Sequence, residues 1–290
     1  MKLQTPVAIE PLPFRLGYED KFFFMGSCFA DSIGSLMQEA GFCITRNPFG
    51  VLYNPASIAQ SFARLESRQA FTGADVICSE GLYTSFWHHS RFSRHSPEEF
   101  LADANAALES AADAFAAAGV CVVTLGTSWV FRHLERDMIV SNCHKLPSGQ
   151  FRRERLLPGQ SAALLAAVVE RHPEKEWIFT VSPIRHMADG AHGNQISKAA
   201  LLLAVDSLQE RFDNVFYFPA YEIMMDELRD YRFYEENMTH PSHLAEEYIF
   251  ECFRQFAIDA ECQERIAAAR RSTRAARHRP FQFGNPSPNE

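Results

Sequence analysis

Short apolar runs alternate with helix-like segments along this chain, and that alternation constrains its fold more than any other feature. Four runs have the length and the β-branched or aromatic content of buried strands: residues 22–25, 121–125, 177–181 and 215–218. A regular exchange of strands and helices is typical of a parallel sheet that is covered by helices on both faces. We therefore expect an α/β protein with a three-layer α/β/α fold and a mainly parallel sheet.

Helical patterns follow or precede these strands and complete this arrangement. We expect helices at residues 30–40, after the Ser96-Pro97-Glu98-Glu99 start signal, and at 162–171, 197–212 and 244–256, the last with Ser242 as its N-cap. No linker or internal repeat divides the chain. We predict one domain over residues 1–264, followed by a basic C-terminal helix or tail over 265–290.

Charge and composition exclude several classes of partner. The formal net charge is −8, so no global positive field attracts nucleic acid. The chain has no uninterrupted stretch of about 18 apolar residues, and its first residues lack the apolar region of a secretory signal. We expect a cytoplasmic protein that binds a small molecule, with no nucleic-acid or membrane partner and an oligomeric state that the sequence leaves open.

Cysteine and histidine spacing gives no sign of a disulfide framework or a metal centre. The seven cysteines are odd in number and never spaced as Cys-x-x-Cys, and no His-x-x-x-His pair occurs. Glycine-rich phosphate loops and dinucleotide fingerprints are also missing. We expect no metal and no cofactor.

Polar residues that follow the strands indicate where a ligand binds, because open parallel sheets bind ligands beyond the carboxyl ends of their strands. After the first strand, Ser27 and Cys28 stand at the start of a helix. Free N–H groups and the helix dipole favour a thiolate there, and a thiolate can attack an acyl carbon. The alternative is a small buried cysteine beside a serine N-cap.

The pentapeptide at residues 26–30, Gly-Ser-Cys-Phe-Ala after an apolar strand, resembles the defining motif of the GSCFA family, which is similar to the GDSL or SGNH esterases and acyltransferases. Supporting matches are Asn47-Pro48-Phe49-Gly50, Leu125-Gly126-Thr127, residues 142–145, 182–186 and 226–234, and His240-Pro241-Ser242. The resemblance implies an SGNH-hydrolase-like fold.

By this resemblance Cys28 occupies the nucleophile position, Ser27 lies where the esterases carry aspartate, and His240 is the catalytic base. The residue three before the histidine is Asn237 rather than an acid. An asparagine orients an imidazole by hydrogen bonding, but it does not stabilise the positive form as a carboxylate does. A Cys–His pair tolerates this loss better than a Ser–His pair, because thiols ionise more readily than alcohols.

An oxyanion hole needs hydrogen-bond donors that converge on one point. The resemblance proposes the backbone N–H of Cys28, the backbone of Gly50 and a group in Gly126-Thr127-Ser128, where Ser128 replaces the asparagine of the esterases. Asn47 and Asn54 are possible amide donors. For Gly50 or Gly126 taken alone, simple turn geometry is the better explanation.

The segment after the third strand contributes charge and further candidate bases. Arg185 is suited to grip a carboxylate or phosphate bidentately, or else it pairs with Asp189 or Asp230. His144 and His186 are alternatives to His240 as the base.

These residues predict an acyl hydrolase or acyltransferase that uses a Cys–His centre on a small ester or an acylated carbohydrate-like substrate. The departures at Ser27, Ser128 and Asn237 leave an alternative open, a non-catalytic protein that binds a carbohydrate or an acidic metabolite on the same scaffold.

Overall fold

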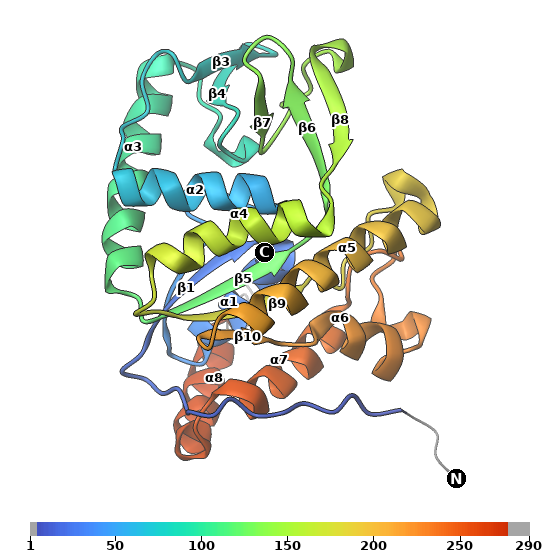
Figure 1. Cartoon of the computed structure of the whole chain (residues 1–290). Helices are drawn as coiled ribbons and strands as arrows, with labels where there is room; N and C mark the ends of the chain where they lie inside the picture. The colour runs from blue at the N-terminus through green and yellow to red at the C-terminus, as the bar shows by residue number, and fades with distance from the viewer. Residues whose placement is uncertain (1–4, 278–290) are drawn as a thin grey trace, which may run out of the picture.

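A five-stranded parallel sheet forms the centre of the computed structural model, which describes residues 5–277. The strands lie in the order β10-β9-β5-β1-β2, and every neighbouring pair is parallel. Their bounds are β1 Lys21–Gly26, β2 Cys43–Arg46, β5 Val120–Leu125, β9 Glu176–Val181 and β10 Val215–Tyr217. All four predicted strands are present, and the predicted α/β class with a parallel sheet is confirmed (Figure 1).

Side chains alternate across this sheet and divide the core into two halves, one on each face. Phe23 and Met25 of β1 pack on one face with helices α2 (Pro55–Ser67), α3 (Pro97–Ala117), α4 (Pro158–Arg171) and α5 (Gly190–Arg211). Phe22 and Phe24 pack on the other face with α1 (Cys28–Glu39) and α7 (His243–Ala257). The molecule is therefore a three-layer α/β/α structure.

The strand order places one crevice in a special position. From β1 the chain adds β2 on one side of the sheet and β5, β9 and β10 on the other, so the direction of winding reverses between β1 and β5. Ligands of open α/β sheets bind at such a switch point, outside the carboxyl ends of the strands. The segments after β1 and β5, which begin at Ser27 and Gly126, meet there.

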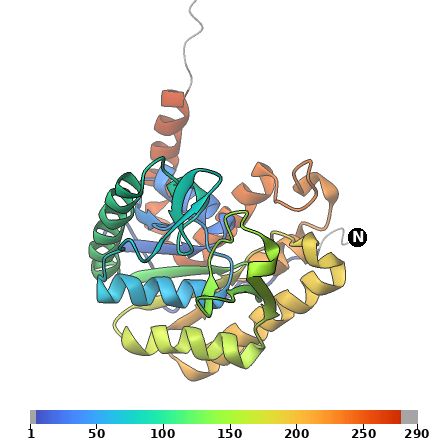
Figure 2. The ribbon, with the colours of Figure 1, turned by 90° about the horizontal axis from the view of Figure 1, so that it is seen from above.

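Two small antiparallel sheets beside the main sheet were not expected from the sequence. One is the hairpin of β3 (Val76–Ser79) and β4 (Leu82–Ser85), and the other joins β6 (Trp129–His133), β7 (Met138–Val140) and β8 (Phe151–Arg155). Hydrogen bonds connect them, among them those from Ser141 N–H to the Phe86 carbonyl at 2.8 Å and from Ser79 Oγ to the His144 carbonyl at 2.6 Å. Figures 1 and 2 show them together at one end of the molecule.

Helix boundaries follow the predicted pattern with three differences, and α2 was not predicted. Helix α1 starts at Cys28 rather than at residue 30, α4 at Pro158 rather than at residue 162, and α5 at Gly190 rather than at residue 197. These early turns are poor in the apolar periodicity on which the predictions relied. Ser242 caps α7 as expected, because its side chain accepts a hydrogen bond from the N–H of Ala245.

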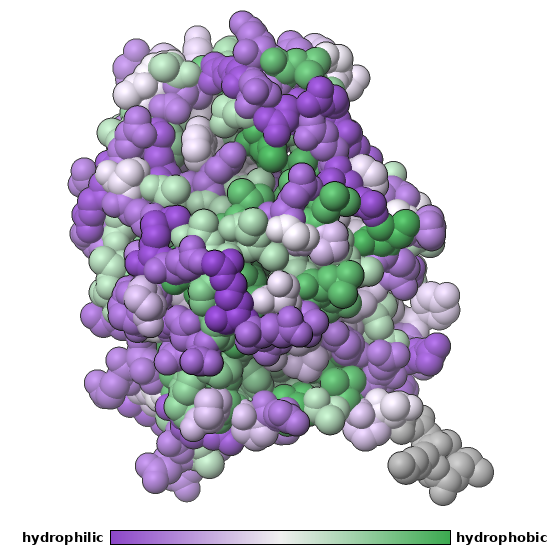
Figure 3. Space-filling model, in the orientation of Figure 1, coloured by the Kyte–Doolittle hydropathy of each residue, from purple (hydrophilic) through white to green (hydrophobic). Residues whose placement is uncertain are grey.

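The described chain ends in helix α8 (Gln263–Arg277). A short helix, α6 (Ala220–Glu222), lies between β10 and α7. Residues 278–290 of the predicted basic tail lie outside the described residues, and the division at residue 264 stays a prediction. Within residues 5–277 no helix has the length and apolar character needed to cross a membrane. On the face seen in Figure 3, hydrophilic and hydrophobic residues are interspersed.

Candidate functional site

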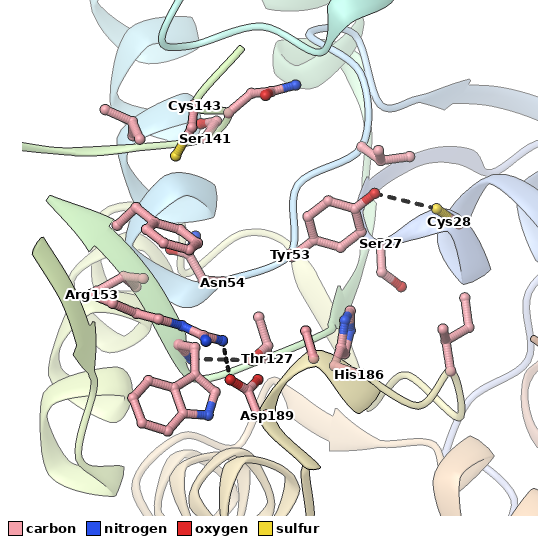
Figure 4. A pocket seen from close by; sticks show the side chains of 18 of the residues that line it. Ser27, Cys28, Tyr53, Asn54, Thr127, Ser141, Cys143, Arg153, His186 and Asp189 are labelled. Atoms are coloured by element: carbon pink, nitrogen blue, oxygen red, sulfur yellow. Dashed lines mark hydrogen bonds and ion pairs between the residues drawn. The ribbon is translucent and has the colours of Figure 1, made fainter. Parts of the chain in front are cut away.

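A cavity of about 770 Å³ opens at the carboxyl ends of β1, β5 and β9. Part of its wall comes from the small β6–β8 sheet, which contributes Arg153 (Figure 4). His89 contributes from the segment that follows the β3–β4 hairpin. Seven residues that the sequence proposed for the site line this cavity: Ser27, Cys28, Asn54, Thr127, Arg185, His186 and His240. Six others are not part of its lining: Asn47, Gly50, Gly126, Ser128, His144 and Asn237.

The sharp turn between β1 and α1 positions the serine and the cysteine. Gly26 has φ +145°, and a Cβ at this residue would lie 2.1 Å from the carbonyl oxygen of Thr124 on β5. Its N–H donates to Asn47 Oδ1 at 2.8 Å. Only glycine allows this close approach of two backbones, and the turn presents Ser27 and Cys28 to the cavity.

The thiol of Cys28 contacts a phenol rather than an imidazole. Its Sγ lies 3.6 Å from Tyr53 Oη, and burial raises the pKa of Tyr53 above its usual range, so the phenol keeps its proton at neutral pH. Within residues 5–277, no histidine nitrogen lies within hydrogen-bonding distance of this sulfur. The expected direct Cys28–His240 contact is thus not formed.

Three residues that line the cavity each carry a buried polar atom with no hydrogen-bond partner in the described part of the chain. These atoms are the hydroxyl oxygen of Ser27, a residue only 1% exposed, Nε2 of His186 and Nε1 of Trp129. Ser27 occupies the N-cap position of α1, but its side chain makes no capping bond. Burial lowers the pKa of His186 to about 4, so this imidazole is neutral at pH 7. In Figure 4 the Ser27 hydroxyl and the His186 ring extend into the same space.

A short hydrogen-bonded chain favours one tautomer of His240. Thr239 Oγ1 donates to Asn237 Oδ1 at 2.8 Å and lies 3.2 Å from His240 Nδ1. Because the single hydroxyl proton goes to Asn237, the threonine oxygen accepts from Nδ1–H. Nε2 is then left with a free lone pair, as a base requires. Asn237 therefore orients the imidazole through Thr239, which the sequence analysis missed.

Most of the proposed oxyanion donors are already committed. The N–H groups of Gly126 and Thr127 both donate to the Tyr53 carbonyl at 2.8 Å, and the N–H of Gly50 donates to the Asn47 carbonyl at 2.9 Å. The Ser128 hydroxyl is buried against Ser197 Oγ at 3.2 Å.

The side-chain amides also have structural roles. Asn54 caps α2 by accepting from the N–H of Ser57 and donating to its hydroxyl, and Asn47 Nδ2 donates to Asp31. The donors that remain are the first N–H groups of α1, at Cys28 and Phe29, since a helix leaves its first turn without internal acceptors.

His144 holds the two small sheets together. It is 8% exposed, its Nε2 lies 2.8 Å from the Ser85 carbonyl, and burial lowers its pKa. These contacts make it a structural residue rather than a candidate base.

At the far end of the cavity, Arg153 of β8 forms an ion pair with Asp189. The guanidinium carbon lies 4.9 Å from the Trp129 ring centroid and 5.4 Å from that of Phe131. The sequence offered Asp189 as a partner for Arg185, but the structure pairs it with Arg153. No pattern marked Arg153 or Trp129, because they meet only when β6 and β8 pair.

A buried lysine lies beneath the loops that form the floor of the cavity. Lys198 Nζ donates to the carbonyls of Gly126 and Ser182, both at 2.7 Å, which ties the ends of β5 and β9 together. Burial lowers its pKa to about 7.

The described residues contain no group of three or more His, Cys, Asp or Glu side chains that could hold a metal ion.

The chain matches one known protein family and has a weak structural similarity to one solved protein. The chain is similar in structure to a family 3 carbohydrate esterase from Clostridium thermocellum, with a TM-score of 0.40 and 9% sequence identity over 86% of this chain and 98% of that chain. No match is found among curated proteins. The model of the GSCFA family matches residues 21–253, which include every strand of the central sheet and the whole candidate site. The chain therefore belongs to the GSCFA family.

Proposed function

We propose that this protein is an acyl-transferring enzyme of the SGNH type, an esterase or an acyltransferase, that forms a thioester on Cys28. One observation carries the proposal: Cys28 at the N-terminus of α1 and His240 with a free Nε2 line the same cavity, at the switch point of the sheet. Neither feature alone is specific. Together they supply a nucleophile, a base and a space that admits a small molecule.

The proposed reaction has two steps. The Cys28 sulfur attacks the carbonyl carbon of an ester, and His240 Nε2 takes the thiol proton. The oxyanion that forms accepts hydrogen bonds from the first N–H groups of α1, and the positive end of the helix dipole stabilises it. The alcohol leaves with the proton from His240. Water or a second alcohol then attacks the thioester, with His240 again as the base, and the thiol is restored.

One neighbour supports this chemistry. A proton donated by Tyr53 Oη to the sulfur stabilises the thiolate, because a hydrogen bond to a charged acceptor is stronger than one to a neutral acceptor. The hydroxyl of Ser27 is unpartnered, so the experiment must distinguish the two nucleophiles.

The first test is selective labelling of cysteines with iodoacetamide at pH 7, followed by peptide mass spectrometry. Cys28 is expected to react fastest of the seven cysteines. Cys143 is the matched control, because it lines the same cavity while burial raises its pKa to about 11. If Cys28 reacts no faster than Cys143, the thiolate proposal is wrong.

The second test uses p-nitrophenyl acetate as the acyl donor. An acetyl group is expected on Cys28, and it should disappear in Cys28→Ala but persist in Ser27→Ala. Acetylation of Ser27 in the wild-type protein would instead identify the serine as the nucleophile.

A non-catalytic binding protein is the second candidate function. It is favoured by one observation, that the contact of the Cys28 sulfur is with Tyr53 rather than with an imidazole. This candidate predicts that no ester or thioester is turned over and that Cys28→Ala leaves ligand binding intact.

A further inference from the structure

Arg185 is a charged group in the cavity whose partner is missing from the described part of the chain. Its side chain is half-buried, and within residues 5–277 it forms no ion pair, no hydrogen bond and no stacking contact with an aromatic ring. Both acids that the sequence offered are engaged elsewhere. Asp189 pairs with Arg153, and Asp230 accepts from the N–H of Arg232 at 2.9 Å.

The charge balance of the cavity is correspondingly positive. Asp189 is the one acidic residue in its lining within the described chain, and Arg153 neutralises it. His186 carries no charge at pH 7, because burial lowers its pKa to about 4. An uncompensated cation therefore remains in the cavity of a chain whose formal net charge is −8.

The surroundings of Arg185 include the loop that carries His240 and two tyrosine hydroxyls. Its N–H donates to the Thr239 carbonyl at 3.1 Å, so its backbone is tied to the loop that carries His240. Burial raises the pKa values of the Tyr221 and Tyr234 hydroxyls, and the positive charge of the Arg185 guanidinium opposes part of this rise. Removing a guanidinium partly from water without a partner is costly, and a bound anion offsets that cost.

We infer that Arg185 binds an anionic group of the substrate, a carboxylate or a phosphate. The planar guanidinium donates two parallel hydrogen bonds to either group. This identification of the substrate class rests on the proposed function, whereas the anion site itself does not. An anion site at Arg185 favours a substrate with an acidic acyl group or an acidic acceptor over a neutral sugar ester.

The anion site is tested by binding, in a protein that cannot react. In Cys28→Ala, isothermal titration calorimetry with succinate and with inorganic phosphate is expected to detect binding. Arg185→Met should weaken this binding at least tenfold, since a hydrogen bond to a charged group contributes about 1.5–3 kcal/mol. Arg185→Lys, which keeps the charge but not the fork, should be intermediate. Tighter binding of succinate assigns a carboxylate, and tighter binding of phosphate assigns a phosphate.

Arg152→Met is the matched control, because Arg152 lies on the same strand as Arg153, pairs with Glu154 and is not part of the cavity lining. It removes the same charge and should leave binding unchanged. Thermal unfolding of each variant establishes that it is folded. Equal anion binding in Arg185→Met, or no binding to the parent protein, overturns the inference even if Cys28 is acylated. Arg185-dependent binding without acylation of Cys28 overturns only the proposed function.

The reaction supplies a second readout. Acylation of wild-type Cys28 is expected to be about tenfold faster with p-nitrophenyl hemisuccinate than with p-nitrophenyl acetate. Arg185→Met should abolish this preference and Arg152→Met should retain it. A preference that survives in Arg185→Met counts against the inference.

Discussion

The hydroxyl of Tyr53 shapes the environment of the Cys28 sulfur, at 3.6 Å. The same residue also holds the next loop, because its carbonyl accepts from the N–H groups of Gly126 and Thr127. It therefore connects the segment after β1 with the segment after β5. The phenol stays protonated at neutral pH and acts as a donor toward a thiolate.

Tyr53→Phe removes this donor while it keeps the ring. We expect alkylation of Cys28 by iodoacetamide at pH 7 to slow by about tenfold, because the thiolate loses a charge-assisted hydrogen bond. The rate at Cys143, measured on the same sample, is the internal control and should not change. An unchanged or faster reaction at Cys28 would show that the phenol does not stabilise the thiolate.

At the scale of elements, the turn between β1 and α1 depends on contact with the neighbouring strand. Gly26 meets the backbone of Thr124, the N–H of Ser27 donates to the Thr124 carbonyl at 3.1 Å, and the side chain of Asn47 holds the turn from the end of β2. The nucleophile position is thus built by three strands rather than by the motif alone.

Gly26→Ala should destabilise the protein, by roughly 3 kcal/mol or more, because its Cβ would overlap the Thr124 carbonyl and its φ is strained for alanine. Gly159→Ala is the matched control. Gly159 lies in the first turn of α4, and a Cβ there meets no atom within 4 Å. Its replacement is expected to be neutral or to stabilise by up to about 1 kcal/mol. Urea unfolding of both variants measures the difference, and equal effects would refute this explanation.

For the whole molecule, a buried histidine joins the β3–β4 region to the main core. His88 lies among aromatic rings, with centroids 4.6 Å from Phe71 and 4.7 Å from Phe92, and its Nδ1 lies 2.7 Å from Ser85 Oγ. Burial lowers its pKa to about 3. The ring is therefore held neutral in the folded state.

This histidine predicts a loss of stability in acid. The unfolded chain takes up a proton near the ordinary pKa of histidine, 6.5, which folded His88 accepts only near pH 3. The free energy of unfolding should therefore fall as the pH decreases from 6.5 toward 3, by up to ~1.4 kcal/mol per pH unit. His88→Gln keeps a partner for Ser85 and does not titrate, so its stability should depend less on pH. Chemical denaturation at several pH values tests this, and identical slopes would contradict it.

Local patterns in the sequence were sufficient for the main architecture. Four strands of the central sheet were identified because their apolar runs are continuous, and Ser242 was identified as a cap because its spacing is local. Strand β2 and the small sheets were missed, since their residues are few and half-exposed and carry no distinct periodicity. The residues proposed for the site came from the family motif and from positions directly after strands.

The sequence by itself determined the α/β class, the position of Ser27 and Cys28 at the start of a helix, and the candidate base His240, because each depends on neighbouring residues or on a motif. Only the tertiary structure decided the contacts of these groups. Tyr53 rather than a histidine contacts the sulfur, Thr239 links Asn237 to His240, and Arg153 takes Asp189 and leaves Arg185 unpaired. The pairings at Cys28 and Asp189 join segments that lie far apart in the chain, and the Thr239 link depends on how one loop folds. No local periodicity encodes such contacts, because they form only when the sheet brings the ends of its strands together.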